Sequence, residues 1–235
     1  MRLALGDAVR LLRERYGTPE GPGTADPFEL ILWENVAYLA LPARRREAFA
    51  ALKSTVGTSP SAILTAGQAA LERVTARGIL KHTFAAKLRE CARLAIKRFG
   101  GDLGKPIREP VHGAKRALRL FPGIGEPGAE KILLFSGRQP LLAPDSNGLR
   151  VLVRLGLVAA KKSYAATYAA SRKAAEALPA RPRILQEAHL LLQQHGQTLC
   201  KRTAPRCHLC PLAHGCAHAR GGRSTEPASR TRRQR

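Results

Sequence analysis

The sequence predicts an all-α protein, and two observations support this fold class. Apolar residues recur at helical spacing along most of the chain, and no segment alternates apolar and polar residues as a half-buried strand does. Aromatic residues are only 5% of the total, so the core is expected to consist of Leu, Ala, Val and Ile, which suit helices. We therefore expect a series of helices joined by short breaks.

The helices follow one another from the N-terminus with recognisable start and stop signals. The first is expected at residues 4–17, before a break rich in Gly and Pro at 17–27. The second opens with Asp26 as an N-cap and Pro27 at the first helical position. It continues through residue 41 and is apolar on nearly all sides, as a buried helix is. Further helical patterns cover residues 43–56, 59–66, 68–76, 83–98, 110–120, 127–136, 145–155, 163–177 and 182–195.

The charge of the chain indicates a polyanionic partner. Its 40 Lys and Arg residues outnumber 17 acidic residues, which gives a formal net charge of +23. Nucleic acid is the usual partner of so basic a protein. A solvated basic surface without a partner is the alternative, because charge alone is only an electrostatic footprint.

The sequence shows neither an export signal nor a membrane span. No segment has the charged start, apolar run and small-residue cleavage site of a signal peptide. No stretch reaches the ~18 apolar residues that a membrane-spanning helix needs. We therefore expect a cytoplasmic, nucleoid-associated protein without a membrane partner. In that compartment, five cysteines favour metal binding or catalysis over disulfides.

Four cysteines lie within one short stretch, CKRTAPRCHLCPLAHGC. They are Cys200, Cys207, Cys210 and Cys216, spaced C-x6-C-x2-C-x5-C, and their thiolates suit one metal centre. Zinc sites usually consist of two close pairs, whereas only Cys207 and Cys210 form such a pair here. A [4Fe–4S] cluster also takes four thiolates and suits uneven loops. The fifth cysteine, Cys91, stands alone on a predicted helix and is expected to be a small buried hydrophobic residue.

The cysteine loop resembles the iron–sulfur loop at the C-terminal end of the endonuclease III family of DNA glycosylases. Three further stretches resemble that family in the same order. DPFELILWENVAYL is similar to the helix that begins its central domain, LFPGIGEPGAEKILLF to its helix-hairpin-helix, and APDSNGLRVLVRLGL to the segment with its catalytic aspartate. The matches extend from residue 26 to residue 216. The resemblance implies a [4Fe–4S] cluster on the four cysteines and double-stranded DNA as the partner.

The stretch LFPGIGEPGAEKILLF predicts a tight turn at the start of a helix. Gly123 and Gly125, on either side of Ile124, can take positive φ and leave room for close backbone approach. The helix start then points unpaired N–H groups at whatever lies against the turn, and a phosphate fits that position. An ordinary helix–helix connection is the alternative. Together with the cysteine loop and the charge, the turn favours contact with the DNA backbone.

Pro127 occupies the position at which bifunctional members of the family carry a lysine. The resemblance therefore implies an enzyme without the Schiff-base amine of those members. Lys131, one helical turn later, is a possible substitute amine, although a displacement of about 5–6 Å is large for catalysis. We interpret Lys131 as a lysine that lies on the helix surface or contacts phosphate.

Two carboxylates are candidates for the chemistry. The resemblance implies that Asp145 stabilises the cationic sugar and orients or deprotonates the nucleophile, whereas the local pattern alone makes it a helix N-cap. Glu34 lies inside an apolar stretch and is expensive to bury unless it is paired or protonated. Its position resembles the glutamate with which adenine-excising mismatch glycosylases protonate the departing purine. A glutamate that is exposed, or paired to an Arg, is the alternative. The paired glutamines of those enzymes are here Tyr38 and Leu39.

We expect two helical domains with a cleft between them. The central domain spans residues 26–138, residues 1–25 and 139–218 form the iron–sulfur domain, and residues 219–235 form a basic disordered tail. The resemblance implies that DNA lies bent across the cleft with the target nucleotide flipped out. The candidates for a wedge that fills the resulting gap are Leu39, Ile79 and Leu80. The candidates for phosphate contacts are Lys201, Arg202 and Arg206.

The sequence therefore predicts a monomeric DNA N-glycosylase of base excision repair that removes a damaged or mispaired base and uses water as its nucleophile. A bifunctional glycosylase and AP lyase, with Lys131 or another amine as nucleophile, is one alternative. A catalytically silent DNA-binding homologue is the other, and the presence of Asp145 speaks against it.

Overall fold

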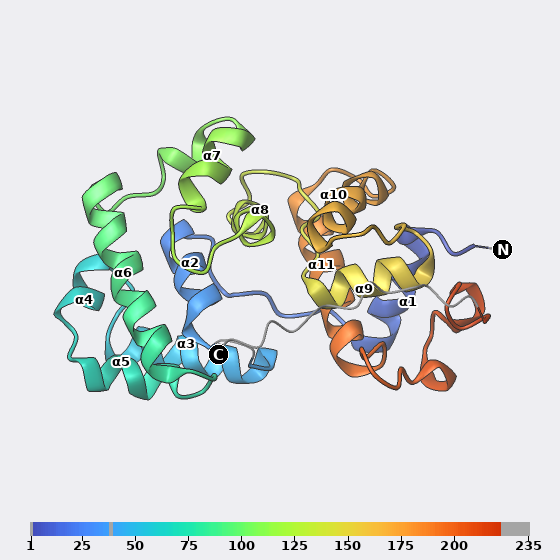
Figure 1. The fold of residues 1–235 in the computed structure, drawn as a ribbon, viewed down its shortest axis with the longest axis horizontal. Coiled ribbons are helices and arrows are strands. Elements are labelled where there is room, and N and C mark those ends of the chain that lie inside the picture. Colours follow the sequence, from blue (N-terminus) through green and yellow to red (C-terminus); the bar gives the residue numbers. More distant parts are fainter. Residues whose placement is uncertain (1, 38–39, 222–235) are drawn as a thin grey trace. The chain divides into compact units, whose positions relative to one another are not determined.

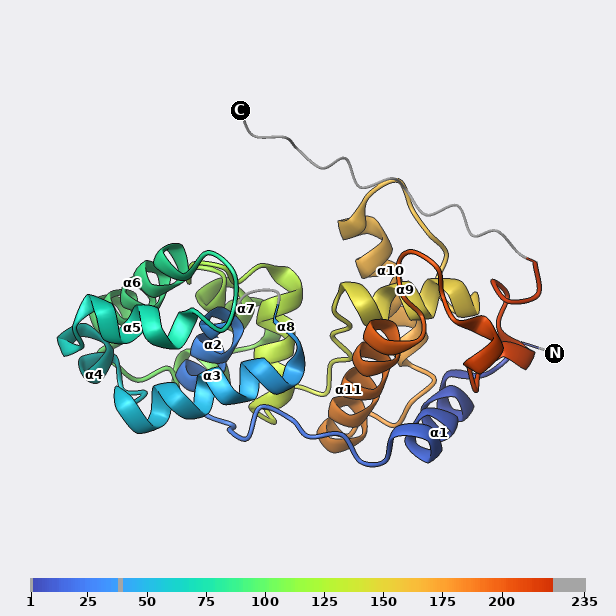
Figure 2. The same cartoon turned by 90° about the horizontal axis from the view of Figure 1, so that it is seen from below.

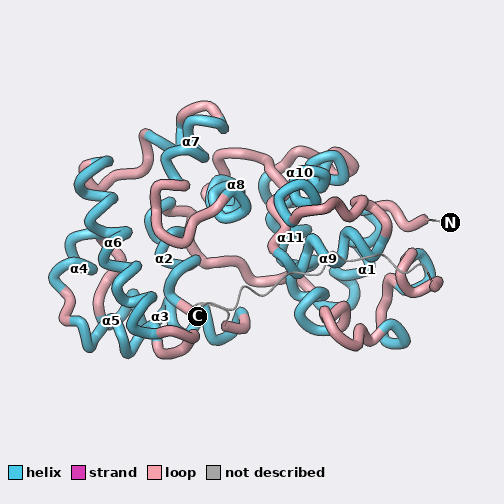
Figure 3. Tube along the Cα trace, viewed as in Figure 1, coloured by secondary structure: helices cyan, strands magenta, loops and turns pink. Residues whose placement is uncertain are grey.

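The computed structural model describes residues 2–37 and 40–221, which form helices and loops without a strand (Figures 1 and 3). The predicted all-α fold class is confirmed. The expectations for Tyr38, Leu39 and residues 222–235 lie outside the described residues. The α-helices are α1 (Leu5–Tyr16), α2 (Pro27–Val36), α3 (Pro42–Thr55), α4 (Pro60–Thr65), α5 (Gln68–Thr75), α6 (Lys81–Phe99), α7 (Val111–Leu118), α8 (Glu126–Phe135), α9 (Ser146–Leu155), α10 (Tyr164–Ala175) and α11 (Pro182–Thr198). Short 3-10 helices are η1 (Pro106–Arg108), η2 (Cys207–Leu209) and η3 (Ala213–Gly215).

The chain forms two compact units. One unit is Gly21–Pro140, and the other combines Met1–Glu20 with Leu141–Arg235. The second unit is therefore discontinuous in sequence, because its N-terminal helix packs with the C-terminal part of the chain. We call the first the hairpin unit and the second the cysteine unit.

Helix α6 organises the hairpin unit. It contacts α2, α4 and α5, and Figure 2 shows α4 and α5 beside it. Helix α8 contacts both α2 and α7. The side chains of Ile31, Leu88 and Leu133, from α2, α6 and α8, have no exposed surface. Three helices that are distant in sequence thus share one apolar core.

Helix α2 begins as the sequence predicts but ends earlier. The Asp26 carboxylate accepts a hydrogen bond of 2.8 Å from the Glu29 amide, and Pro27 occupies the first turn. The helix ends at Val36, whereas the apolar pattern predicted a helix through residue 41. The extended backbone of Leu41, which precedes Pro42, explains why the apolar stretch cannot run directly into α3 as one helix.

In the cysteine unit, α11 contacts α9 and α1. The close approach of α9 and α11 depends on Gly196, because a Cβ there would lie 2.7 Å from the backbone oxygen of Asn147. The guanidinium of Arg13 on α1 pairs with the carboxylate of Glu187 on α11. Within the described part of the chain, no helix combines the length and the apolar character that crossing a membrane requires.

Candidate functional site

The turn between α7 and α8 is held from α2. Gly123 has φ +80°, and a Cβ at this position would lie 2.5 Å from the side-chain oxygen of Asn35. The buried Asn35 amide donates hydrogen bonds of 3.1 Å to the carbonyls of Ile31 and Pro122. Both backbone conformation and packing therefore require glycine at position 123. The sequence did not predict a role for Asn35. Its only signal there is that it is a polar residue, next to Glu34, in an apolar stretch.

Gly125 differs from Gly123 and from our expectation. Its backbone is extended, with φ −90°, so no left-handed conformation requires glycine. A Cβ at Gly125 would meet only Pro127, at 3.9 Å. The side chain of Ile124 is buried in the core, and its amide donates to the Phe121 carbonyl at 3.1 Å. Gly125 is exposed and lies directly before α8, where the amides of Glu126 and Gly128 are among those that have no intrahelical acceptor.

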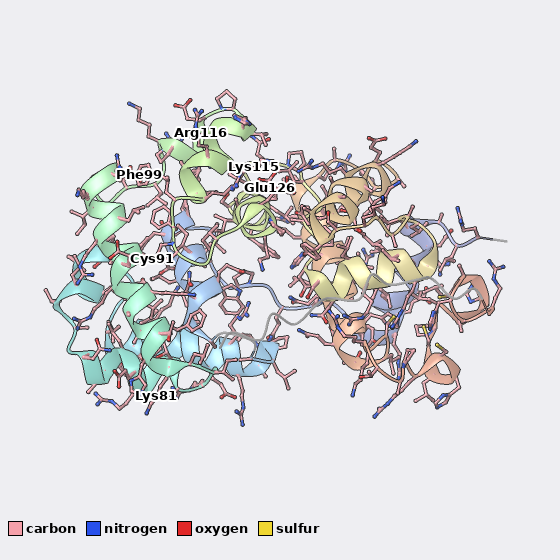
Figure 4. All side chains as sticks on the ribbon, viewed as in Figure 1. Lys81, Cys91, Phe99, Lys115, Arg116 and Glu126 are labelled. Carbon is pink, nitrogen blue, oxygen red and sulfur yellow. The ribbon has the colours of Figure 1, made fainter. Side chains whose placement is uncertain are left out.

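A carboxylate that the sequence analysis did not consider stands in this first turn. The Glu126 side chain pairs with Lys115 on α7 (Figure 4). It also lies 3.5 Å from the Arg119 guanidinium. Lys115 also contacts the buried Glu130 at 3.0 Å. Burial works to lower the pKa of Lys115, but hydrogen bonds to Glu126 and Glu130 raise it overall. Lys115 of α7 and Arg119, directly after that helix, thus compensate the acidic charge at the start of α8.

Pro127 occupies the first turn of α8, as predicted, and Lys131 lies one turn further on. The Lys131 ammonium is 2.6 Å from Oε2 of Glu34, and both side chains are only 15% exposed. Lys131 is therefore largely covered and does not stand free on the helix surface, while its predicted alternative, contact with phosphate, stays a prediction. Its charge is held against the carboxylate of α2.

Glu34 lies near a second cation as well. The Arg45 guanidinium is 3.9 Å from Oε1 of Glu34 and 5.9 Å from the centre of the Trp33 ring. One Arg45 nitrogen donates to the Ala37 carbonyl over a long distance of 3.4 Å. Its Nε is buried and has no hydrogen-bond partner among the described residues. Glu34 therefore has an arginine beside it, as in the predicted alternative, but its close ion pair is with Lys131.

The wedge candidates Ile79 and Leu80 are exposed. Their side chains are 50% and 60% exposed, and they stand immediately before α6. Leu80 has φ +56°, an unfavourable conformation for a residue with a side chain. Helix α6 consequently begins at Lys81, two residues earlier than the helical pattern predicted. The third candidate, Leu39, is outside the described residues.

In the cysteine unit, Asp145 caps α9 and accepts four hydrogen bonds. Its Oδ1 accepts from the amides of Asn147 and Gly148 at 2.9 and 2.8 Å. Its Oδ2 accepts from the side chains of Asn147 and Gln193 at 3.1 and 2.9 Å. Burial alone would raise the pKa of the Asp145 carboxyl, but the charge of His189 and these hydrogen bonds outweigh it and lower the pKa. Asp145 is therefore a fixed carboxylate, and Gln193, from a distant helix, had no signal in the sequence.

Two buried arginines of α9 connect this cap to the cysteine loop. Arg150 donates to Oδ1 of Asn147 and to the carbonyl of Cys200, both at 2.9 Å. Arg154 donates to the carbonyls of Lys201 and Arg202 at 2.6 and 2.9 Å. The loop backbone therefore faces α9. The side chains of Lys201, Arg202 and Arg206 are exposed, and their contact with phosphate stays a prediction.

The four cysteines of the loop line one cavity together with Arg154 and His195. The thiol of Cys200 lies 3.5 Å from Arg154, and Cys210 lies 3.4 Å from His195. Burial raises the pKa of the Cys210 thiol to about 11. In the described part of the chain, no three His, Cys, Asp or Glu side chains are arranged to hold a metal ion. The four cysteines share one cavity, and their binding of a metal stays a prediction.

Comparisons with known proteins agree with the predicted resemblance, although no protein-family model matches the chain. It is 27% identical over 136 residues to a thymine/uracil-DNA glycosylase of Pyrobaculum aerophilum, a match that covers 57% of this chain and 56% of that protein. It is 26% identical over 208 residues to a thymine-DNA glycosylase of Aeropyrum pernix, covering 86% of this chain and 88% of the relative. It is 25% identical over 160 residues to endonuclease III of Rickettsia prowazekii, covering 68% and 69%.

Solved structures give the same result for the fold. A trapped endonuclease III–DNA covalent intermediate matches with a TM-score of 0.73 and 19% identity, covering 93% of this chain and 98% of that one. A thermostable thymine-DNA glycosylase matches with a TM-score of 0.72 and 16% identity, covering 92% and 95%. The resemblance to the endonuclease III-like DNA glycosylases is confirmed, and the chain has their helix-hairpin-helix fold.

Proposed function

We propose that this chain is a monofunctional DNA glycosylase that hydrolyses the N-glycosidic bond of a damaged or mispaired base in duplex DNA. The named relatives support the enzyme class, since they are DNA glycosylases and an endonuclease III. The net charge of +23 supports a DNA partner. We expect the protein to act as a monomer.

The observation that carries this proposal is the environment of Asp145. Hydrolysis breaks the bond from C1′ to the base nitrogen, the electron pair leaves with the base, and positive charge develops on the sugar. Four hydrogen bonds hold the Asp145 carboxylate in one place. Its negative charge can therefore stabilise the positive charge on the sugar without reorganisation of the site. The same hydrogen bonds make Asp145 a weak base, so its main role is electrostatic. The oxygen of water forms a bond to C1′, and the proton that water loses passes through solvent to the departed base.

The arrangement around Pro127 supports water as the nucleophile. Proline has no amine, and the ammonium of Lys131 is committed to Glu34 at 2.6 Å. An amine nucleophile must reach C1′ of the sugar, and this ammonium is held against the Glu34 carboxylate. A bifunctional mechanism through Lys131 would need this pair to break first.

Three surfaces are suited to contact DNA. Gly125 leaves open space before the first amides of α8, which suits a phosphate. The exposed Lys201, Arg202 and Arg206 add positive charge on the cysteine loop. The exposed Leu80, in its unfavourable backbone conformation, is the stronger wedge candidate of the two described.

The four cysteines are proposed to hold a [4Fe–4S] cluster. Four thiols that line one cavity supply the kind and number of ligands that a [4Fe–4S] cluster takes. The cluster would have a structural role, because the buried Arg150 and Arg154 connect its loop to the helix that Asp145 caps.

The test compares Asp145→Asn with Asp26→Asn, which changes another helix-capping aspartate. Duplexes that carry uracil, a thymine mispair, an alkylated purine or thymine glycol are incubated with each protein and then treated with alkali. We expect release of at least one base, strand cleavage only after alkali, and a loss of at least about a hundredfold in Asp145→Asn alone. Cleavage without alkali, with an adduct trapped by borohydride and lost in Lys131→Ala, would establish the bifunctional alternative. No release from any duplex would establish the silent homologue.

A further inference from the structure

The start of α10 presents an aromatic ring and two lysines at the surface of the cysteine unit. Lys161, Lys162 and Tyr164 are exposed, and 48% of the tyrosine surface is accessible. The sequence has no acidic residue between Asp145 and Glu176, so the segment that carries this ring is basic. An aromatic ring interleaved with cations is the composition of a surface that binds nucleic acid.

The exposed tyrosine is held in place from within the unit. Its ring stacks on that of Tyr168, with the centroids 6.2 Å apart and an angle of 20° between the planes. Tyr168 is only 3% exposed, so the supporting ring belongs to the core. The Lys161 amide donates a hydrogen bond of 3.0 Å to the buried Thr167 hydroxyl, which fixes the preceding loop. A ring that is already held in place binds a ligand with little further loss of conformational freedom.

Tyr164 also lies near the proposed catalytic carboxylate, within the same unit. Helix α10 packs against α9, the helix that Asp145 caps, and Figures 1 and 2 both show the two helices side by side. Partial burial raises the pKa of the Tyr164 hydroxyl, and the charge of Asp145 raises it further. The hydroxyl is therefore protonated at neutral pH, and the carboxylate is close enough for its charge to act on it.

We infer that Tyr164 is a further substrate-binding residue, whose ring packs against the deoxyribose of the target nucleotide while Lys161 and Lys162 contact neighbouring phosphates; the inference rests on the proposed action of Asp145 at C1′. C1′ is an atom of this deoxyribose, so a side chain beside Asp145 meets the same sugar. The C–H groups of the sugar suit the face of an aromatic ring. The phosphates on either side of the sugar suit the two ammonium groups.

A contact of this kind favours the flipped state of the nucleotide. Flipping turns the nucleotide about its backbone and removes it from the stack of bases. A sugar contact that forms only after this rotation stabilises the flipped nucleotide relative to the intact duplex. Deoxyribose is the same in all four nucleotides, so the contact does not depend on which base is excised.

The first experiment measures affinity for two duplexes of the same sequence, one undamaged and one with a single tetrahydrofuran residue, a sugar analogue without a base. Tyr164→Ala should bind the tetrahydrofuran duplex about fourfold to tenfold more weakly, the effect of losing roughly half of the burial of an aromatic side chain. Its affinity for the undamaged duplex should change by less than about twofold. Tyr164→Phe should bind both duplexes like the unsubstituted protein, because the ring makes the contact.

Two further variants separate the ring from the lysines and from general apolar surface. Changing Lys161 and Lys162 together to Ala should lower the slope of log affinity against log salt by about one to two units on the tetrahydrofuran duplex. Ile96→Ala is the matched control, since Ile96 is 44% exposed on α6 of the hairpin unit. It should change neither the slope nor the preference for the tetrahydrofuran duplex.

A second measurement uses the unsubstituted protein, so that it does not depend on the folding of a variant. Hydroxyl-radical oxidation followed by mass spectrometry reports which side chains a ligand covers. The tetrahydrofuran duplex should slow oxidation of Tyr164 more than the undamaged duplex does, and neither duplex should slow oxidation of Ile96.

The outcomes separate this inference from the proposed function. If Tyr164→Ala keeps the full preference for the tetrahydrofuran duplex, or if that duplex does not slow oxidation of Tyr164, the inference is overturned, and Asp145-dependent base release would still support the glycosylase. An equal loss of preference in Ile96→Ala overturns the assignment to Tyr164. A preference that depends on Tyr164, in a protein that releases no base from any duplex, supports the sugar contact and overturns the glycosylase proposal.

Discussion

Gly123 and Gly125 stand in the same turn, but the structure gives them different reasons to be glycine. Gly123 has φ +80° and lies directly against Asn35. Gly125 has an extended backbone that any residue adopts, and a Cβ there has space. Packing within the hairpin unit therefore explains why residue 123 is glycine. It does not explain the glycine at residue 125, which suits close approach of a partner such as DNA.

This contrast gives a prediction for two single substitutions. Gly123→Ala should lower the free energy of unfolding by about 1–3 kcal/mol, because alanine is strained at positive φ and its Cβ meets Asn35. Gly125→Ala should leave stability within about 0.5 kcal/mol of the original but weaken DNA binding. Urea unfolding and titration with undamaged duplex measure the two effects. If Gly125→Ala binds duplex as tightly as the unsubstituted chain, the phosphate does not approach at this glycine.

The site residues that the sequence predicted and those that it missed differ in one physical respect. Asp145 follows from a local pattern, a cap before a helix, together with the resemblance. Gln193 and Asn35 act on partners 48 and 87 residues away, so no spacing rule reveals them. The pairing of Lys131 with Glu34 is equally non-local, so no local pattern predicts that this lysine is largely covered.

At the scale of elements, the sequence predicted the order and type of the helices well and their ends less well. The Asp26 cap and the start of α2 are confirmed, because capping depends on adjacent residues. The end of α2 at Val36 and the start of α6 at Lys81 depend on the backbone of the following and preceding loops. The short helices η2 and η3 bring the cysteines around their cavity and have too few residues for a periodic signal.

The loop between Cys200 and Cys207 is the element whose contacts are best tested by the salt dependence of DNA affinity. Arg154 holds two of its carbonyls, while Lys201, Arg202 and Arg206 remain exposed. Changing these three residues to Ala should lower the slope of log affinity against log salt by about two to three units, since each phosphate contact contributes roughly 0.9.

The matched control for this measurement removes the same charge from the hairpin unit. Arg93, Lys97 and Arg98 are exposed on α6, and their triple Ala variant should leave the slope nearly unchanged. Equal changes in both variants would show that the loop contributes only net charge and makes no specific phosphate contact.

At the scale of the whole molecule, the N-terminal helix α1 packs against the C-terminal part of the chain in the cysteine unit. Leu12 of α1 has no exposed surface, and α1 contacts α11. The Tyr16 hydroxyl lies 3.0 Å from Nδ1 of His195, whose other ring nitrogen lies 3.4 Å from the thiol of Cys210. The N-terminal helix does not line the cavity of the cysteines, but its Tyr16 contacts His195, which does.

This arrangement predicts that a change in α1 affects the metal centre. Leu12→Ala should cost about 2–5 kcal/mol in stability, the usual range for a fully buried leucine, and should lower the iron and sulfide retained per chain. Arg10→Ala, on the exposed side of the same helix, should change neither quantity. Thermal unfolding together with iron and sulfide analysis measures both.

A Leu12→Ala protein that is destabilised but keeps its full iron content would show that α1 supports the fold without supporting the cluster. A colourless unsubstituted protein with one zinc ion per chain would instead remove the cluster from the proposal altogether.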